Sequence, residues 1–386
     1  MKGRKLLMIP GPVEFDPSVM RAMGSPTTSH VAPAFIESFG HSLEMMRQVW
    51  MAPKGQPFII AGTGTLAMDI AGANLTEPGD RALVISTGYF GDRYAELLKR
   101  YGADVTVLKA ATGETVAPEA IEAELKKENY KLLTFTHVDT STAVLVRPEP
   151  IGQLGRRYGV LTILDGVCSV AGEEIRQEEW GIDIVLTASQ KAVGVPPGLA
   201  LLVASEMAME AWRKRSTPVG NYYADWANWL PVMEAYEQRR PSYFGTPAVN
   251  LVAALEVSLS LILKEGMEAR FRRHDRAGHA FREAVRALGL TMVPTADSHA
   301  ANTLSAPRYP AGVDPAAFMK AMASTDVIVA GGLLPEIKNE YFRVGHMGQV
   351  NRSDLVATVA AIETALMACG YPFEAGNGVR SILNLF

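Results

Sequence analysis

The stretch DIVLTASQKAVGVPPGLALLVAS, residues 183–205, contains two apolar runs on either side of a loop that holds Lys191. Neither run alternates polar and apolar residues, as a strand with one solvated face would. Continuous apolar strands are buried on both faces and are typical of a largely parallel sheet between helices. Pro196 and Pro197 restrict the loop, because proline fixes φ. We therefore expect Lys191 to be held in place rather than free in solvent.

Five further apolar runs precede this stretch, and helical patterns separate most of them. The runs cover residues 56–62, 81–87, 103–110, 130–138 and 160–167. Alternating strands and helices form right-handed βαβ units. We predict an α/β fold whose large domain has a mostly parallel, seven-stranded sheet between helices.

The pattern changes after about residue 207, where a segment rich in tryptophan and tyrosine leads into a long helical stretch, 247–288. The remainder of the chain alternates short strands and helices, which indicates a smaller α+β domain. A length of 386 residues suits two domains. We predict three parts: an N-terminal arm (1–14), a large cofactor-binding domain (15–263) and a small C-terminal domain (264–386).

The composition excludes several classes of partner. A formal net charge of −4 provides no basic surplus for nucleic acid or anionic membranes. No apolar run reaches the ~18 residues of a membrane-spanning helix. Two cysteines, Cys168 and Cys369, are too few for a disulfide framework. We predict a cytoplasmic protein with no nucleic-acid or membrane partner.

Three charged residues and one turn are candidates for a functional site. Asp165 ends one apolar run and Lys191 follows another, so both belong at the carboxyl edge of the sheet, where α/β folds bind ligands. The loop at 61–69, AGTGTLAMD, offers backbone N–H groups for an anion. Arg343 can bind a carboxylate through two hydrogen bonds. Each feature alone has an ordinary alternative: a tight turn, an ion-paired carboxylate, or an exposed lysine or arginine.

Together, the four features fit pyridoxal phosphate chemistry. That chemistry needs an anion cradle for the phosphate, a lysine for a Schiff base, a carboxylate for the pyridine nitrogen and a cation for the substrate carboxylate. No histidine pair has the spacing of metal ligands, and no GxSxG motif occurs. We predict neither a metal site nor a serine hydrolase.

The sequence resembles the alanine–glyoxylate and serine–pyruvate aminotransferases, which are class V aminotransferases of pyridoxal-phosphate fold type I. The fungal alanine–glyoxylate enzymes are the most similar in style. The resemblance runs over nearly the whole chain. It is carried by PGPVEFDPSVMRAM (10–23), STGYFGDR (86–93), THVDTSTAV (136–144), LDGVCSVAGEE (164–174), YFGTPAVN (243–250), VIVAGGL (327–333) and YFRVGHMG (341–348), in addition to the opening stretch.

The resemblance implies a pyridoxal phosphate cofactor and a role for each matching residue. Lys191 would carry the cofactor as a Schiff base and act with Asp165 in catalysis. The substrate would contact Gly11 and Arg343. A homodimer is implied, because Tyr243 and Thr246 would reach the phosphate of the neighbouring subunit. The remaining cofactor contacts would come from Thr63, Gly64, Thr65 and Gln190 at the phosphate, Phe90 on the ring face and Thr140 at the ring hydroxyl.

Three positions depart from the pattern of many relatives. Thr65 stands where some carry histidine, and Phe90 where many carry tryptophan. Val31 stands where many carry arginine. Phe90 keeps a ring for stacking, and Thr65 keeps its backbone N–H, so these departures leave the implied roles possible.

The resemblance implies transfer of the amino group of L-alanine to glyoxylate by a ping-pong mechanism. Serine–glyoxylate or serine–pyruvate transamination is the alternative donor assignment, and 2-aminoethylphosphonate–pyruvate transamination would need a phosphonate site. A cysteine desulfurase would need a mobile nucleophilic cysteine, for which Cys168 and Cys369 are poorly placed. A non-catalytic subunit of another complex would have no need of Lys191 and Asp165.

Overall fold

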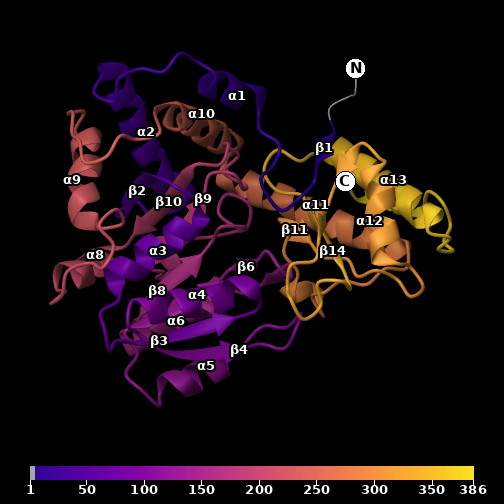
Figure 1. Cartoon of the computed structure of the whole chain (residues 1–386), viewed down its shortest axis with the longest axis horizontal. Helices are drawn as coiled ribbons and strands as arrows, with labels where there is room; N and C mark the ends of the chain where they lie inside the picture. The colour runs from indigo at the N-terminus through magenta and orange to yellow at the C-terminus, as the bar shows by residue number, and fades with distance from the viewer. Residues whose placement is uncertain (1–4) are drawn as a thin grey trace.

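The large domain is built on a seven-stranded sheet, which Figure 1 shows beside the smaller C-terminal part of the chain. The computed structural model describes residues 5–386. β10 is antiparallel to both of its neighbours, and all other neighbouring strands are parallel. The predicted fold class is confirmed. The strand order is β2 (Gln56–Ala61), β10 (Leu199–Ala204), β9 (Ile184–Ala188), β8 (Leu161–Asp165), β5 (Leu132–Thr136), β3 (Arg81–Ser86) and β4 (Asp104–Lys109).

Helices cover the sheet on both faces. Every residue of β5, β8, β9 and β10 is buried, and successive strand residues point to opposite faces. Full burial of the central strands therefore requires cover on both sides. The helices of this part are α1 (Pro17–Met23), α2 (Pro33–Val49), α3 (Gly64–Leu75), α4 (Tyr89–Arg100), α5 (Pro118–Leu125), α6 (Pro148–Tyr158), α7 (Gln177–Trp180), α8 (Glu206–Arg213), α9 (Trp226–Glu237) and α10 (Val249–Glu265).

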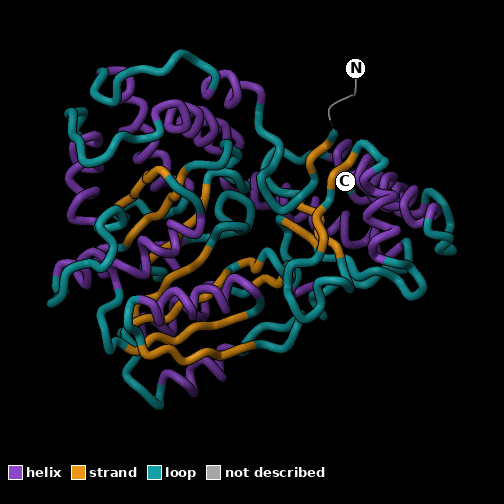
Figure 2. Tube along the Cα trace, in the orientation of Figure 1, coloured by secondary structure: helices purple, strands orange, loops and turns teal. Residues whose placement is uncertain are grey.

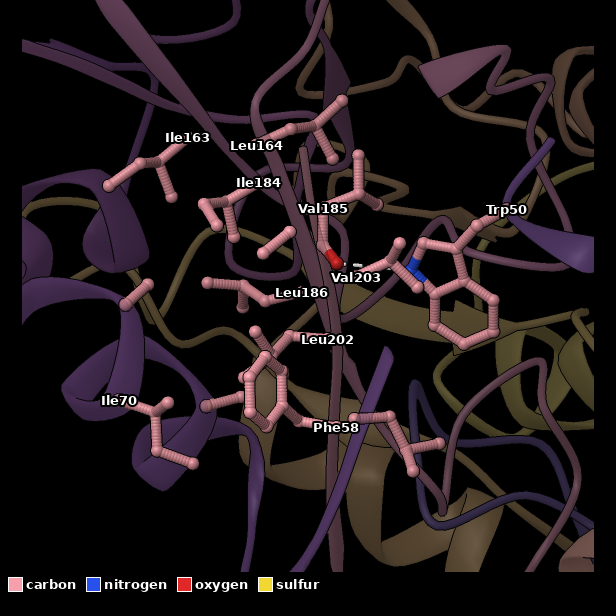
Figure 3. Packing of buried hydrophobic residues seen from close by; sticks show 14 of the residues in the cluster. Trp50, Phe58, Ile70, Ile163, Leu164, Ile184, Val185, Leu186, Leu202 and Val203 are labelled. Atoms are coloured by element: carbon pink, nitrogen blue, oxygen red, sulfur yellow. Dashed lines mark hydrogen bonds between the residues drawn. The ribbon is translucent and has the colours of Figure 1, made fainter. Parts of the chain in front are cut away.

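Apolar side chains from the strands and helices form one continuous core in the large domain. Figure 3 shows Ile163, Val185 and Leu202 of neighbouring strands in one cluster with Ile70 of α3 and with Trp50, which follows α2. Trp50 is 1% exposed, and its indole N–H donates to the carbonyl oxygen of Val185 at 3.0 Å. This bond satisfies the one polar group that the buried indole carries. The core therefore fixes the strands whose ends carry the candidate site.

Figure 2 shows a separate group of strands and helices in the C-terminal part. This part also has its own cluster of buried apolar residues. β11 (Leu304–Ser305), β14 (Phe342–Gly345) and β13 (Ala330–Gly331) form a three-stranded antiparallel sheet in that order. The helices here are α11 (Met267–Ala287), the 3₁₀ turn η1 (Asp297–His299), α12 (Pro315–Ala323), α13 (Arg352–Ala368) and α14 (Asn377–Leu385).

The long predicted helix over 247–288 is two helices. Gly266 ends α10 and precedes α11, with a φ of +83°. This left-handed conformation is accessible to glycine and breaks the helix. The predicted domain border between residues 263 and 264 lies in the last turn of α10. It stays a prediction.

The N-terminal segment joins the C-terminal part of the chain to the large domain. β1 (Leu6–Leu7) pairs in parallel with β12 (Val327–Ile328). The chain then continues to residues 10–13, beside Lys191. Residues 1–4 of the predicted arm lie outside the described residues. Within residues 5–386, no helix combines the length and apolarity that crossing a membrane would need.

Candidate active site

Helix α3 begins at the predicted anion-binding turn. The N-cap residue, Thr63, forms no side-chain capping bond, so the first N–H groups of the helix remain available to an anion. A Cβ at Gly64 would lie 2.8 Å from Val167 Cγ2 and 3.4 Å from Ala188 Cβ. Glycine therefore lets the helix N-terminus pack closely against the ends of β8 and β9.

Asp165 is the last residue of β8 and is 2% exposed. Its Oδ1 accepts a hydrogen bond from the backbone N–H of Val167 at 3.0 Å. Burial raises the pKa of this carboxyl to about 7, with a further upward contribution from the charge of Asp139. The Val167 N–H and the charges of Lys191 and Arg93 act in the opposite direction. A cation placed against Asp165 would stabilise its ionised form.

Lys191 lies in the turn after β9 and is 9% exposed. Its Nζ donates a hydrogen bond to the carbonyl oxygen of Pro10. A Cβ at Gly11 would overlap the Lys191 side chain, and Gly11 has a φ of +103°. The N-terminal segment is also fastened here, since the Val13 N–H donates to the carbonyl oxygen of Gln190 at 3.2 Å. The Pro10–Gly11 turn therefore covers the reactive end of Lys191.

Phe90 lies in the first turn of α4, one helical turn before Arg93. The Arg93 guanidinium carbon lies 4.9 Å from the Tyr89 ring centroid and 5.1 Å from that of Phe90. Arg93 Nη1 also donates to Thr65 Oγ1 at 3.3 Å, and Nη2 donates to the Tyr89 hydroxyl at 3.2 Å. Arg93 thus places a cation beside the N-terminus of α3.

The start of α4 is held by Asp139, a fully buried residue of the two-residue strand β6 (Val138–Asp139). Asp139 Oδ2 accepts from the backbone N–H of Phe90 at 3.0 Å and of Gly91 at 3.4 Å. Its Oδ1 accepts from the backbone N–H of Ser141 at 2.9 Å. Burial raises the pKa of Asp139, and these hydrogen bonds lower it. Asp139 therefore fixes the Phe90 ring relative to the 139–141 loop.

The other side of this loop meets β14 of the C-terminal part. Arg343 Nε donates to the carbonyl oxygen of Gly331 at 2.8 Å, and Nη1 donates to that of Thr140 at 3.2 Å. The Tyr341 hydroxyl donates to the carbonyl oxygen of Ser141. Burial lowers the pKa of Arg343. Arg343 is held against the 139–141 loop by backbone acceptors, and no carboxylate of residues 5–386 pairs with it.

Thr140 faces the loop that follows Asp165. Its Oγ1 lies 2.6 Å from the Sγ of Cys168, three residues beyond Asp165 in the chain. Both residues are buried, at 6% and 1% exposed. Cys168 is therefore enclosed, while Cys369 follows α13 at the far end of the small domain.

Direct contacts join Thr65 to Phe90 through Arg93, Thr140 to Arg343, and Gly11 to Lys191. Tyr243 and Thr246 lie elsewhere, in the exposed loop before α10. Tyr243 is 63% exposed, and its ring lies 5.1 Å from that of His30. No hydrogen bond or ring contact within residues 5–386 joins Tyr243 or Thr246 to Lys191 or Asp165. Their predicted role across a subunit boundary stays a prediction.

The described residues fit pyridoxal phosphate. The N-terminus of α3 and Arg93 offer donors and positive charge for a phosphate, and no cation within residues 5–386 forms a salt bridge with the buried Asp165. The amide of Gln190 forms no hydrogen bond within residues 5–386, and its Oε1 is buried. A ligand with an anion at one end and a protonated nitrogen at the other would satisfy these groups.

Sequence reasoning missed Arg93 and Asp139 as parts of the site. Arg93 had a usable signal, since it lies three residues after Phe90 and so shares a helix face with it. Asp139 also had one, because this carboxylate comes directly after the apolar run at 130–138, much as Asp165 lies near the end of the run at 160–167. The Pro10 carbonyl contact with Lys191 had no local signal, since it joins segments 181 residues apart.

Comparison with known proteins places these features in one family. The family model for class-V aminotransferases matches residues 20–336. The alanine–glyoxylate aminotransferase 1 of Saccharomyces cerevisiae is 39% identical, with 89% of this chain and 91% of the yeast protein aligned. The serine–glyoxylate aminotransferase of Arabidopsis thaliana is 31% identical, over 98% and 94%. The crystal structure of ureidoglycine–glyoxylate aminotransferase from Bacillus subtilis superposes with a TM-score of 0.93 at 28% identity, over 100% and 98%.

Proposed function

Since the chain belongs to the class-V aminotransferases, which depend on pyridoxal phosphate, we propose that it transfers the amino group of L-alanine to glyoxylate. The products are pyruvate and glycine. The observation that carries the proposal is the position of Asp165 and Lys191 at the ends of β8 and β9, against which the N-terminus of α3 packs. Arg343 is held at the neighbouring 139–141 loop. The 39% identical yeast relative, named an alanine–glyoxylate enzyme, supports this choice of substrates.

Each end of the cofactor has a proposed partner. Asp165 would hold the proton on the ring nitrogen, Phe90 would stack on the ring and Thr140 would bond the ring hydroxyl. The turn Thr63–Thr65 and Gln190 would hold the phosphate. When bound, the cofactor supplies an electron sink for the charge that develops at the substrate Cα.

Arg93 adds positive charge at the phosphate end. Its Nη1 lies 3.3 Å from Thr65 Oγ1, and Thr65 is the second residue of α3. A phosphate at this helix terminus would therefore lie close to the guanidinium, where a charge-assisted hydrogen bond can form. Stacking against Tyr89 and Phe90 keeps the side chain in position.

Lys191 is the proposed base that moves a proton at the substrate Cα. An amine in this role must be close, held and partly desolvated. Lys191 meets these conditions because it is 9% exposed and its Nζ is bonded to Pro10. The Pro10–Gly11 turn also keeps water away from this amine.

Arg343 is the proposed partner of the substrate carboxylate. It is held by the carbonyl oxygens of Gly331 and Thr140, which orient the guanidinium without neutralising its charge. The Pro10–Gly11 turn restricts the space beside Lys191, which favours a small substrate side chain such as the methyl group of alanine.

Serine is the second candidate donor. The 31% identical Arabidopsis relative is named a serine–glyoxylate enzyme, and serine differs from alanine only by one hydroxyl. A hydrophobic pocket rejects an added hydroxyl only weakly. Both donors are therefore compatible with the enclosed site.

We also propose that the enzyme is a cytoplasmic homodimer. Exposed Tyr243 and Thr246 would complete the phosphate site of the partner subunit. Both cysteines are free, which supports a reducing compartment.

A donor and acceptor panel tests the substrate assignment. Initial rates with glyoxylate would be compared for L-alanine, L-serine, L-aspartate and 2-aminoethylphosphonate. We expect the highest kcat/KM with L-alanine. A higher value for serine would assign the second candidate function. A clear preference for aspartate or for the phosphonate would contradict both.

A further inference from the structure

Tyr341 is a fully buried tyrosine whose hydroxyl group forms three hydrogen bonds. The hydroxyl donates to the backbone carbonyl oxygen of Ser141. It also accepts from the backbone N–H groups of Leu333 at 2.8 Å and of Leu334 at 2.9 Å. The side chain is 0% exposed. A phenolic hydroxyl both donates and accepts, and both capacities are used here.

Tyr341 and Arg343 lie on the same face of one extended segment. Tyr341 directly precedes β14 and already forms an antiparallel bridge to the neighbouring segment. Successive residues of an extended segment point to opposite faces. Phe342 and Val344 accordingly belong to the apolar core of the C-terminal part. On the other face, Tyr341 and Arg343 both reach the 139–141 loop.

Both backbone acceptors of Arg343 lie close to groups that bond the Tyr341 hydroxyl. Arg343 Nη1 donates to the carbonyl oxygen of Thr140 at 3.2 Å, and the next carbonyl along the chain accepts from the hydroxyl. Arg343 Nε donates to the carbonyl oxygen of Gly331 at 2.8 Å. The hydroxyl accepts from the N–H groups two and three residues further on. It therefore fastens together the two segments that orient the guanidinium.

The 139–141 loop also contacts the residues proposed to bind the cofactor ring. The Ser141 hydroxyl accepts from the backbone N–H of Tyr89 at 3.0 Å, at the start of α4 and next to Phe90. Thr140 of the same loop is the proposed partner of the ring hydroxyl. The position of this loop relative to β14 therefore sets the distance between the ring and the cation proposed for the substrate carboxylate.

The Tyr341 ring is packed where the two parts of the chain meet. It belongs to a small apolar cluster with Val138 and Ala192 of the large domain and Met347 of the C-terminal part. A Cβ at Gly332 would lie 2.8 Å from the ring Cε1. Phenylalanine would keep this packing, but it would leave two N–H groups and one carbonyl oxygen without their partner.

We propose that Tyr341 is a positioning residue for recognition of the substrate carboxylate, and that it acts through Arg343. Its hydroxyl fixes the two segments whose carbonyl oxygens orient the guanidinium, and so places the guanidinium relative to the cofactor ring. This inference rests on the proposed function, in which Arg343 binds the carboxylate of the amino donor and of the 2-oxo acid.

Two reagents that react with bound pyridoxal phosphate test the proposal in the cofactor-loaded protein. Aminooxyacetate carries a carboxylate, whereas O-methylhydroxylamine lacks one, and loss of the visible chromophore reports both reactions. We expect Tyr341→Phe to react with subsaturating aminooxyacetate about tenfold more slowly than the wild type, and with O-methylhydroxylamine at the wild-type rate. The KM for L-alanine and for glyoxylate should rise by a similar factor with little change in kcat.

A matched control and a double variant separate this role from a general loss of packing. Tyr130, shortly before β5, is also buried, and its hydroxyl donates to Glu124 at 3.0 Å. Tyr130→Phe should react with both reagents as the wild type does. Arg343→Gln should lose the preference for aminooxyacetate. Adding Tyr341→Phe to that variant should have no further effect, because Tyr341 acts through the missing guanidinium.

The outcomes distinguish a failure of this inference from a failure of the proposed function. Loss of the cofactor from Tyr341→Phe, equal slowing with both reagents, or additive losses in the double variant would show a merely structural role and overturn the proposal. An unchanged preference for aminooxyacetate in Tyr341→Phe would overturn it while the proposed function stands. A wild type without a reactive chromophore would overturn the proposed function and this inference together.

Discussion

The protonation state of Asp165 depends on its burial and on the charged groups near its carboxyl. In the cofactor-free protein, burial raises its pKa from 3.8 to about 7. The folded state therefore keeps this proton as the pH rises from 3.8 to 7, while the unfolded chain releases it. The free energy of unfolding therefore falls as the pH rises through this interval. At pH values above 7 the accumulated loss is about 4 kcal/mol.

Asp165→Asn removes this titration. We expect the cofactor-free variant to be more stable than cofactor-free wild type at pH 8, and the two to become similar near pH 4. Urea unfolding of both proteins between these pH values measures the difference. With the cofactor bound the order should reverse, because the asparagine cannot pair with a protonated ring nitrogen. A cofactor-free variant that is less stable at pH 8 would contradict this account.

Arg93 is predicted to act on the phosphate rather than on the substrate. We expect Arg93→Gln to raise the dissociation constant for pyridoxal phosphate about tenfold, equivalent to ~1.4 kcal/mol. Fluorescence titration of the cofactor-free protein provides the measurement. Arg100→Gln, at the exposed end of α4, is the control. Unchanged cofactor affinity together with a raised KM for the amino donor would instead place Arg93 at the substrate.

At the level of secondary structure, the junction before α4 positions the Phe90 ring. A Cβ at Gly88 would lie 2.5 Å from Ser141 Oγ and 2.7 Å from Asp139 Cγ. Gly88→Ala should therefore push α4 away from the loop and destabilise the protein by about 1–3 kcal/mol.

Thermal unfolding and cofactor titration measure the effect of Gly88→Ala. The control is Gly220→Ala, because the nearest atom to a Cβ there is 3.9 Å away. We expect the control to behave as the wild type does. If Gly88→Ala keeps wild-type stability and cofactor affinity, then the contact between Asp139 and α4 does not position Phe90.

At the scale of the whole molecule, the proposed homodimer completes the phosphate site. We expect Tyr243→Phe to remain a dimer and to lose its cofactor faster during gel filtration. Tyr222→Phe, a control at another exposed tyrosine, should retain the cofactor. Sedimentation reports the oligomeric state. Normal cofactor retention in a dissociated monomer would rule out a shared site.

The fold was largely predictable because its strands are continuous apolar runs. All seven strands of the main sheet lie in stretches predicted from sequence. The break at Gly266 was missed, because one glycine within a long helical pattern does not show whether the helix continues. Contacts between distant segments, such as Pro10 with Lys191 and Asp139 with α4, were not predictable, since they depend on how segments far apart in the sequence pack together.

The most direct test of the central claim is the absorption spectrum of the purified protein during a half-reaction. We predict that the wild type carries a visible chromophore, that L-alanine removes this absorption with release of pyruvate, and that glyoxylate then restores it. Lys191→Ala should not complete this cycle. If the wild type binds no chromophore, or if Lys191→Ala cycles as the wild type does, the assignment of Lys191 as the cofactor-bearing residue is wrong.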